Sequence, residues 1–345
     1  MSRAAPIVIA ILYPREWYGD PAGFDREIDR LQALDERIEV VVEPYIEAHE
    51  RRTGGSDVPP PPELTDAQRA ALGRAEIALA MDLPDGLADV APGLRWVQSV
   101  GAGVNHIQSK VAAIDARLTT NGGSNSIGIA EFGLARLLEH WKRFDDLRGL
   151  QAEHRWEARF GRQLAGCTLG LIGFGPINQA IAARAAAFGM RVLVVRRSPG
   201  ATPPGVEGVV GPDGLLAVLG ESDAVIAAVP ETPASVGMIG ATELAAMPKG
   251  AFFCNLGRGS LVDEAALVVS LQRGHLGGAA IDVASAEPLP ADHPLWDAPR
   301  LRISAHCSSV PAAMFPSVHR VFRENLVRYL AGDPLASEVA LDAGH

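Results

Sequence analysis

A glycine-rich turn between a predicted strand and a predicted helix is the segment of this sequence whose residue types most clearly suit chemistry. The segment 171–178 (LIGFGPIN) follows an apolar run and precedes apolar residues at helical spacing. Gly173 would permit a tight turn, and Gly175 would let the backbone approach a pyrophosphate held by the N–H groups of the following helix. Pro176 suits the first helical turn, where no N–H donor is needed. The segment therefore predicts a dinucleotide-binding turn, although Asn178 replaces the third glycine of the usual fingerprint.

The end of the next predicted strand indicates which dinucleotide would bind. An NAD site usually has an acidic residue about 20 residues beyond the glycines, where it binds the ribose 2′-hydroxyl. Here the strand ends in Arg196, Arg197 and Ser198. Two guanidinium groups can bind a 2′-phosphate through bidentate hydrogen bonds. The pair favours NADPH over NADH; the alternative is that both arginines only solvate the end of a strand.

Three further segments follow in order and complete a recognisable pattern. They are 255–264 (NLGRGSLVDE), the stretch that runs from 280–283 (AIDV) to 287–290 (EPLP), and 304–306 (SAH). Together with the glycine turn, they resemble the D-isomer-specific 2-hydroxyacid dehydrogenase family, which includes glyoxylate/hydroxypyruvate reductases. The resemblance extends over about residues 97–324 and is weaker in the first 90 residues. It implies a catalytic set of Arg258, Glu287 and His306.

The chemistry of 2-oxoacid reduction supports these residue types. The reaction needs a hydride at the carbonyl carbon and a proton at the carbonyl oxygen. His306 could donate that proton near neutral pH, with the Glu287 carboxylate holding its orientation. Arg258 could bind the substrate carboxylate and polarise the carbonyl. His306 follows an apolar strand, which predicts a position at the carboxyl end of the sheet, where ligands bind in open α/β folds.

The resemblance also implies the remaining binding residues. Cofactor contacts are expected from Gly173, Phe174, Gly175, Pro176, Ile177, Arg196, Arg197, Ser198, Val229, Pro230, Leu256, Gly257, Arg258, Asp282 and His306. Among these, Asp282 would face the nicotinamide carboxamide and Pro230 would lie along the adenosine. Substrate contacts are expected from Gly101, Ala102, Gly103, Val104, Arg258 and His306. In the loop 101–104, small residues would leave backbone N–H groups to bind an anion. Alternatively, the glycines of this loop only form a tight turn.

Two positions depart from the family pattern. Ala284 replaces an aromatic residue, and Ala305 replaces the usual proline before the histidine. Both changes could reshape the pocket without removing the chemistry. Four aromatic residues are candidates for its walls, although core packing is the commoner role: Tyr13, Trp17, Tyr18 and Trp296. His293 is interpreted as structural.

The elements that position these residues alternate between strands and helices, which predicts an α/β fold with parallel sheets. The predicted strands are Ile7–Tyr13, Ile38–Pro44, Ile77–Met81, Leu94–Val100, Arg117–Thr120, Thr168–Ile172, Arg191–Val195, Ala224–Val229, Ala251–Asn255, Ala279–Val283 and Leu301–Ser304. The predicted helices include Phe24–Leu34, Thr65–Arg74, Ile127–Leu150, Asp263–Arg273 and Ala312–Leu330. Thr65, with Gln68 three residues later, predicts a capping box at one helix start.

Two domains are expected, with a boundary near Ser124. Residues 1–123, completed by a C-terminal helix in 311–345, would form a flavodoxin-like substrate-binding domain. Residues 124–310 would form a Rossmann NAD(P)-binding domain, with the substrate between the two domains.

Composition narrows the possible partners. The 345 residues carry 31 Lys and Arg against 41 Asp and Glu, a net charge of −10, and 48% of them are hydrophobic. This composition predicts a folded globular protein, and the acidic balance argues against nucleic acid or an anionic membrane as partner. The apolar run 7–12 is too short to span a bilayer and lacks the pattern of a cleavable signal. The cysteines Cys167, Cys254 and Cys307 form no C-x-x-C pair, so a cytoplasmic protein with reduced thiols and no metal is expected.

The sequence thus predicts an NADPH-preferring reductase that converts glyoxylate, hydroxypyruvate or a similar 2-oxoacid to the D-2-hydroxyacid. The resemblance implies a homodimer, with residues 127–150 and the segment around Trp156 in the interface. One alternative is a dehydrogenase of another small anion such as formate or phosphite; Glu287 argues against formate. A second is a dinucleotide-sensing scaffold like the family's corepressors, which a turnover assay would distinguish.

Overall fold

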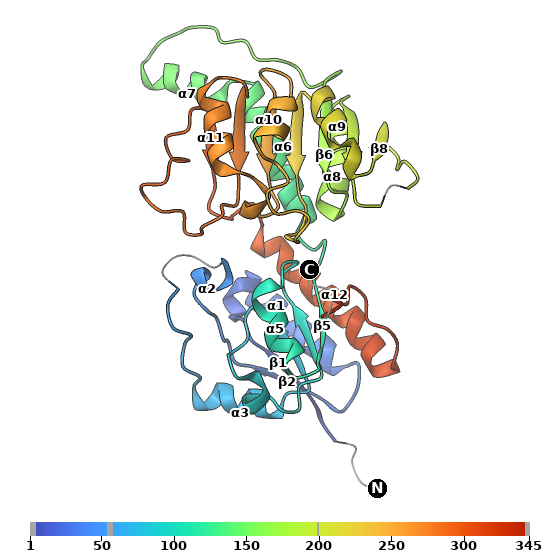
Figure 1. The fold of residues 1–345 in the computed structure, drawn as a ribbon. Coiled ribbons are helices and arrows are strands. Elements are labelled where there is room, and N and C mark those ends of the chain that lie inside the picture. The colour runs from blue at the N-terminus through green and yellow to red at the C-terminus, as the bar shows by residue number, and fades with distance from the viewer. Residues whose placement is uncertain (1–4, 54–57, 199, 342–345) are drawn as a thin grey trace. The chain divides into compact units, whose positions relative to one another are not determined.

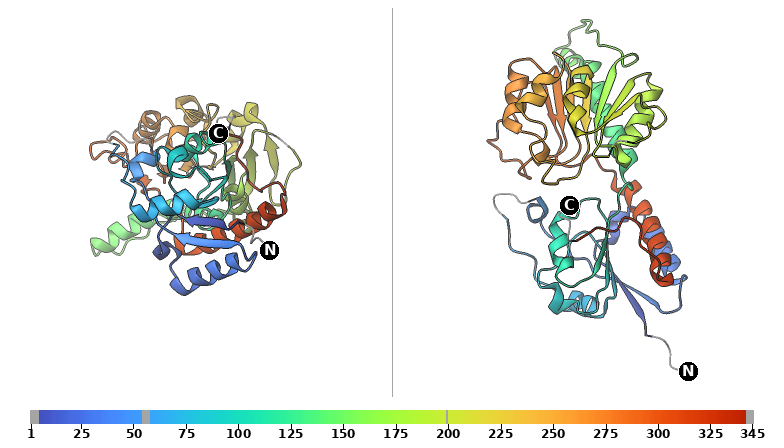
Figure 2. Two further views of the ribbon diagram at one scale, coloured as in Figure 1. Left: turned by 90° about the horizontal axis from the view of Figure 1, so that it is seen from below. Right: turned by 45° about the vertical axis from the view of Figure 1, so that its right-hand side comes forward.

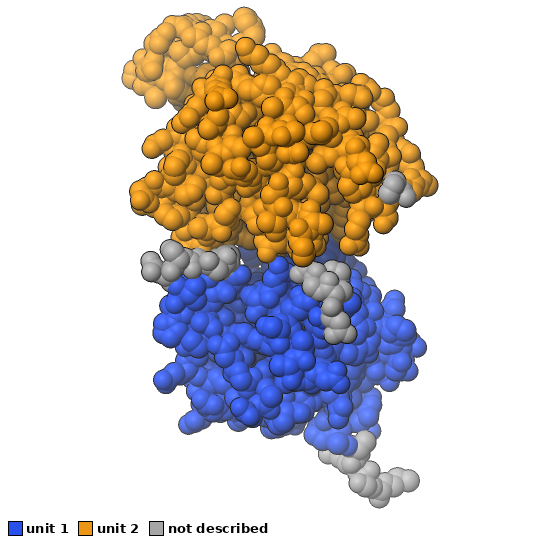
Figure 3. All heavy atoms as spheres, viewed as in Figure 1, with its two compact units in different colours: residues 1–125, 310–345 blue, residues 126–309 orange. Residues whose placement is uncertain are grey.

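The computed structural model describes residues 5–53, 58–198 and 200–341. The chain divides into two compact units, coloured separately in Figure 3. Unit 1 comprises residues 1–125 and 310–345, and unit 2 comprises residues 126–309.

Unit 1 contains a five-stranded parallel sheet in the order β2-β1-β3-β4-β5. Its strands are β1 (Ile7–Ile11), β2 (Ile38–Val42), β3 (Ile77–Ala80), β4 (Trp96–Ser99) and β5 (Arg117–Thr119). Its helices are η1 (Arg15–Tyr18), α1 (Pro21–Gln32), α2 (His49–Thr53), α3 (Asp66–Arg74), α4 (Leu87–Val90), α5 (Asn105–Ala112) and α12 (Pro311–Ala331). This strand order is that of flavodoxin-like folds, so the predicted fold class is confirmed for this unit.

Unit 2 contains a seven-stranded parallel sheet in the order β12-β11-β10-β9-β6-β7-β8. Its strands are β6 (Thr168–Ile172), β7 (Arg191–Val195), β8 (Gly208–Val210), β9 (Ala224–Ala227), β10 (Phe252–Asn255), β11 (Gly278–Ile281) and β12 (Leu301–Ile303). Its helices are α6 (Ser126–Trp141), α7 (Phe144–Ala152), α8 (Pro176–Ala187), η2 (Pro212–Gly214), α9 (Leu215–Glu221), α10 (Ala241–Ala246), η3 (Gly259–Leu261) and α11 (Glu264–Gln272). The strand order reverses at β6, as in a Rossmann fold, which confirms the predicted class.

The central strands of both sheets are buried on both faces, which explains why they read as continuous apolar runs. Successive side chains of a strand point to opposite faces. In β10, Phe253 therefore packs with the core on the α9–α11 side, whereas Phe252 and Cys254 pack with α6 and α8. The helices covering the two faces of each sheet can be followed in Figures 1 and 2.

The predicted single helix Ile127–Leu150 is wrong, because the structure has two helices there. Helix α6 ends at Trp141, and Arg143 adopts a left-handed conformation with φ of 57° before α7 begins. Asp145 and Asp146 then occupy the first turn of α7, where carboxylates interact favourably with the helix dipole. Apolar spacing continues through both helices, so periodicity alone did not reveal the break.

The edge strand β8 was not predicted. It has three residues, one of them glycine, and all three are only partly buried. Such a short edge strand lacks the long apolar run that identifies a buried strand. No helix in the described part of the chain is long and apolar enough to cross a membrane.

Candidate active site

The segments singled out in the sequence lie at one edge of the sheet of unit 2. Strands β10, β11 and β12 are adjacent and parallel. Arg258 follows β10, Asp282 follows β11 and His306 follows β12. Because the carboxyl ends of parallel strands share one edge, the fold brings together residues that are distant in sequence.

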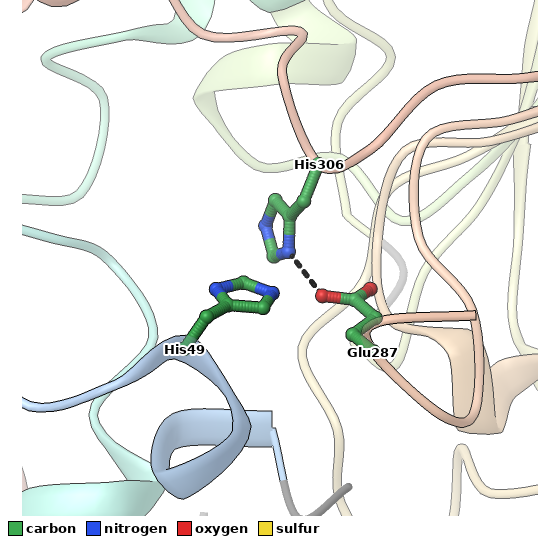
Figure 4. A group of neighbouring side chains, drawn as sticks. All are labelled: His49, Glu287 and His306. Atoms are coloured by element: carbon green, nitrogen blue, oxygen red, sulfur yellow. Dashed lines mark hydrogen bonds and ion pairs between the residues drawn. The ribbon is translucent and has the colours of Figure 1, made fainter. Parts of the chain in front are cut away.

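His306 and Glu287 form a direct pair, drawn in Figure 4. His306 Nδ1 lies 2.9 Å from Glu287 Oε2, and the two side chains are 37% and 11% exposed. The other carboxylate oxygen of Glu287 accepts a hydrogen bond of 2.9 Å from the backbone N–H of Ala284. The carboxylate therefore fixes the ring so that Nδ1 faces Glu287, which makes Nε2 the nitrogen suited to exchanging a proton with a ligand. The third side chain drawn there, His49, belongs to unit 1.

The loop that carries His306 is organised by Asp282, which is only 2% exposed. Its carboxylate accepts hydrogen bonds from Ser304 Oγ at 2.7 Å and from the backbone N–H groups of Cys307 and Ser308 at 3.0 and 3.1 Å. His306 itself has a φ of 50° and donates its N–H to the carbonyl oxygen of Asp282 at 2.7 Å. The sequence predicts a cofactor contact for Asp282 but contains no signal for these loop contacts.

Arg258 leaves the end of β10 with a half-buried side chain. Its Nη1 donates to the carbonyl oxygen of Gly257 at 2.8 Å. Within the described residues it forms no ion pair with a carboxylate, so its charge is not neutralised inside unit 2. The next residue must be glycine, because a Cβ built at Gly259 would lie 1.9 Å from the carbonyl carbon of Ala284.

The glycine turn after β6 has the geometry that a dinucleotide needs. Gly173 has a φ of 87°, and a Cβ there would lie 2.5 Å from Val229 Cγ1, so a side chain is excluded. Gly175 precedes the first residue of α8, and a Cβ there would meet nothing within 4 Å. The turn therefore leaves space beside a helix N-terminus, as pyrophosphate binding requires.

Asn178 stabilises this turn in place of the missing glycine. It is completely buried, and its Nδ2 donates to the carbonyl oxygens of Ile172 and Gly173 at 2.8 and 2.9 Å. The side chain thus satisfies carbonyl groups at the end of β6. Phe174 and Ile177 on either side are partly buried against the core.

The side chains after β7 also fit an additional phosphate. Arg196 is half-buried, and its Nε is buried without a hydrogen-bond partner among the described residues. Its Nη2 lies 3.5 Å from the carbonyl oxygen of Ala201, a long contact. Arg197 and Ser198 are exposed, which leaves their polar groups accessible to a ligand.

The remaining predicted cofactor residues follow β9 and β10. Val229 is half-buried and Pro230 is exposed, with its carbonyl oxygen accepting a hydrogen bond from Ser235 Oγ at 2.8 Å. Leu256 is buried, whereas Gly257 packs closely against the backbone of Val229. All four therefore lie at the same sheet edge as the glycine turn.

The predicted substrate loop, 101–104, belongs to unit 1 and connects β4 to α5. Gly101 donates its N–H to Ser99 Oγ at 3.1 Å, and its carbonyl oxygen accepts from Asn121 at 3.0 Å. Ala102 is exposed, but Val104 is 4% exposed and packs in the core of unit 1. Val104 can therefore contribute only backbone groups to a ligand.

The aromatic candidates divide between core and surface. The pocket-wall interpretation is wrong for Tyr13, which has no exposed surface and bonds His319 inside unit 1. Tyr18 is 7% exposed and packs against the same core, and the half-buried Trp17 stacks on Tyr13. Trp296 is half-exposed and donates its indole N–H to Pro290 at 2.8 Å.

His293 has the contacts of a structural residue, as expected. Its Nδ1 accepts a hydrogen bond from the backbone N–H of Leu295 at 3.3 Å. Its Nε2 lies 3.7 Å from Glu264, whose other oxygen accepts from Ser285 at 2.7 Å. These contacts connect α11 to the loop on either side of Glu287.

Comparisons with known proteins identify the family of this chain. The model of the NAD-binding domain of D-isomer-specific 2-hydroxyacid dehydrogenases matches residues 134–308. The chain is 32% identical over 263 residues to glyoxylate/hydroxypyruvate reductase A of Salmonella heidelberg, covering 73% of this chain and 82% of the relative.

Solved structures extend the likeness to both units. A D-isomer-specific 2-hydroxyacid dehydrogenase family protein from Aeromonas salmonicida is 27% identical, with a TM-score of 0.81 over 98% of this chain and 100% of that one. The NADPH-dependent glyoxylate/hydroxypyruvate reductase of Sinorhizobium meliloti, solved with NADP and sulfate, is 25% identical, with a TM-score of 0.76 over 99% and 100% of the two chains. The protein belongs to the D-isomer-specific 2-hydroxyacid dehydrogenases, a family of NAD(P)-dependent oxidoreductases.

Proposed function

We propose that this protein reduces a small 2-oxoacid, such as glyoxylate or hydroxypyruvate, to the D-2-hydroxyacid with NADPH. The observation that carries the proposal is the His306–Glu287 pair at the sheet edge that also carries Arg258 and the glycine turn. The reaction needs a proton donor, a cation for the substrate carboxylate and a binding site for the dinucleotide. His306, Arg258 and the glycine turn are suited to these three tasks, and Arg258 has no carboxylate partner in the described chain.

His306 acts as the general acid. The carbonyl carbon would receive its hydride from NADPH held at the glycine turn of unit 2. His306 Nε2 gives its proton to the carbonyl oxygen, while Glu287 holds Nδ1 and fixes the orientation of the ring. Arg258 binds the substrate carboxylate and polarises the carbonyl group. In the reverse direction, the same nitrogen takes the proton from the hydroxyl group.

The preference for NADPH is assigned to Arg196 and Arg197. In support, Arg196 is half-buried and Arg197 is exposed, and neither guanidinium group forms an ion pair with a carboxylate of the described chain. Backbone N–H groups at the start of α8 would hold the pyrophosphate next to Gly175. The NADP found in the Sinorhizobium meliloti reductase is in keeping with this choice.

Each unit is assigned a role. Unit 2 binds the dinucleotide, and the loop 101–104 of unit 1 binds the substrate carboxylate through backbone N–H groups. In support, α5 starts directly after this loop, and the apolar side chain of Val104 at its N-cap forms no hydrogen bond to the first turn. The start of a helix with such N–H groups favours an anion. The cytoplasmic location stays a prediction.

We further propose a homodimer formed through unit 2. Trp156 and Phe160 lie fully or almost fully exposed in the extended segment after α7, visible as the long loop in Figure 1. A pocket of about 720 Å³ adjoins this segment, lined by residues that include His140, Phe252 and Arg302. Large exposed aromatic side chains beside such a pocket suit contact with a second copy. Light scattering should give twice the monomer mass, and Trp156→Ala should lower it; a monomeric native protein would contradict the dimer.

The experiment that tests the function is a panel of initial rates. Glyoxylate, hydroxypyruvate, pyruvate and longer 2-oxoacids are each offered with NADPH and with NADH. We expect NADPH to give a higher kcat/KM than NADH with glyoxylate, with hydroxypyruvate or with both. Binding of NADPH without turnover of any acid would refute the reductase and favour the scaffold interpretation.

A further inference from the structure

Asn255, the last residue of β10, is buried next to the catalytic arginine and has no role in the function proposed above. Its side chain is 1% exposed. Its Oδ1 accepts the N–H of Gly257 at 3.0 Å, and its Nδ2 donates to the carbonyl oxygen of Arg258 at 2.8 Å. The amide thus bonds the Leu256–Gly257 peptide through its N–H and the Arg258–Gly259 peptide through its carbonyl oxygen, so it spans the backbone from Gly257 to Arg258.

These two bonds close the turn that directs Arg258 away from the strand. Arg258 has extended backbone angles, φ −137° and ψ 151°, and its own side-chain bond returns to Gly257. The position of the guanidinium group therefore depends on the peptide planes of Gly257 and Arg258. The backbone of Asn255 is fixed in turn, because its carbonyl oxygen accepts from Asp282 at 3.1 Å.

We propose that Asn255 is a positioning residue for Arg258, holding the guanidinium group where the substrate carboxylate binds. This inference rests on the role proposed for Arg258. The turn needs a side chain that accepts one hydrogen bond and donates another across a short distance. Asparagine does both, whereas an ionised aspartate only accepts and would place an oxygen against the carbonyl of Arg258.

The test is a double-mutant cycle measured as kcat/KM for the 2-oxoacid at saturating NADPH. Arg258→Ala alone is expected to lower this constant by about 10²–10³-fold, as for other preorganised groups that stabilise developing charge. Asn255→Ala alone should lower it by about 10- to 100-fold, the usual cost of misplacing a reacting group by about 1 Å. If Asn255 acts through Arg258, adding Asn255→Ala to Arg258→Ala should change it less than three-fold, since coupled residues are not additive.

A second variant separates positioning from general stability. Asn255→Asp keeps the acceptor for Gly257 and can donate to Arg258 only when the carboxyl group is protonated. The ratio of kcat/KM of this variant to that of the native protein should therefore rise as pH falls. A ratio that is constant over the accessible pH range would overturn the proposal, even if Asn255→Ala fails to fold.

A matched control removes a comparable asparagine outside the site. Asn325 of α12 is also fully buried, and its amide bonds Gln98 and Ala336 at 3.1 Å. Asn325→Ala should lower the Tm without changing the KM for the 2-oxoacid. If Asn255→Ala lowers kcat/KM by the same factor in the native protein and in the Arg258→Ala variant, the positioning role of Asn255 is refuted, but the proposed function is not. If Arg258→Ala itself keeps near-native kcat/KM, the proposed role of Arg258 is refuted.

Discussion

Basic side chains gather at the carboxyl edge of the sheet in both units, but they are used differently. In unit 1, Lys110 and Arg51 bond the buried Glu47 at 2.9 and 3.1 Å. Arg52 lies 3.1 Å from Asp82, which has no exposed surface. Burial raises the pKa of Asp82, and Arg52 beside it lowers that pKa in part. These cations are neutralised within the unit.

In unit 2, Arg196, Arg197 and Arg258 form no ion pair with a carboxylate of the described chain. Two histidines differ in exposure. His319 of unit 1 is completely buried and bonds Tyr13, whereas His306 is partly exposed and oriented by Glu287. Residue type alone therefore does not reveal function. An internal carboxylate partner distinguishes the arginines of the two units, and exposure distinguishes the two histidines.

The largest expected effect comes from His306, the more exposed of the two histidines. His306→Asn should fold and bind NADPH but lose about 10²–10⁴-fold in kcat, which is the usual contribution of a general acid. Steady-state rates and NADPH titration measure the two properties. Near-normal turnover would show that His306 is not the proton donor.

Two arginines test the contrast directly. Arg258→Ala should lower kcat/KM by about 10²–10³-fold with little change in Tm, because its charge has no internal carboxylate partner among the described residues. Arg52→Ala should instead cost about 3 kcal/mol of stability, since it leaves the buried Asp82 carboxylate without its cation. Urea denaturation and steady-state kinetics measure stability and kcat/KM for both variants. A large loss of stability in Arg258→Ala with little loss in Arg52→Ala would contradict the comparison.

Arg196 tests the same principle at the cofactor. Arg196→Ala should raise the KM for NADPH by about 10- to 100-fold, the range for one lost charge-assisted hydrogen bond to a phosphate. The KM for NADH should stay constant, since NADH lacks the 2′-phosphate. An equal change for both dinucleotides would contradict the assignment.

His319 gives the smallest effect, on stability alone. Burial, with a contribution from Arg323, lowers the pKa of His319 to about 4. The unfolded chain, with a histidine pKa of about 6.5, then binds a proton that the folded state does not, so stability falls as pH drops from about 6.5 to about 4. The loss should reach about 2 kcal/mol at pH 5.

His319→Gln keeps a hydrogen-bonding group beside Tyr13 and should flatten this pH dependence. Urea denaturation at pH 5 and 7 measures it. An unchanged slope in the variant would show that His319 is not the titrating group.

Much of the fold was predictable from local patterns. Strands β6 and β7 begin and end where the apolar runs predicted, because buried parallel strands have few polar residues. The capping box of Thr65 and Gln68 is also confirmed. The break at Arg143 was not predictable, since its left-handed backbone is adopted by a residue type that usually avoids it.

The candidate site shows the same division. Its motifs could be found in sequence because the glycine turn and the ordered segments around Arg258, Glu287 and His306 are specific. The contacts of Asp282, Asn178 and Asn255 could not, because each bonds backbone groups whose directions depend on the folded chain. Asn178 stood out in the sequence only as a departure from the fingerprint.

The sequence by itself determined the fold class, the family and the residue types that could move a proton and bind anions. These properties follow from apolar periodicity and from short motifs, which are local. Only the tertiary structure decided which charges are neutralised inside the protein and which keep their binding capacity. That outcome depends on neighbours brought together by parallel strands, such as His306 and Glu287, 19 residues apart in sequence and 2.9 Å apart in space.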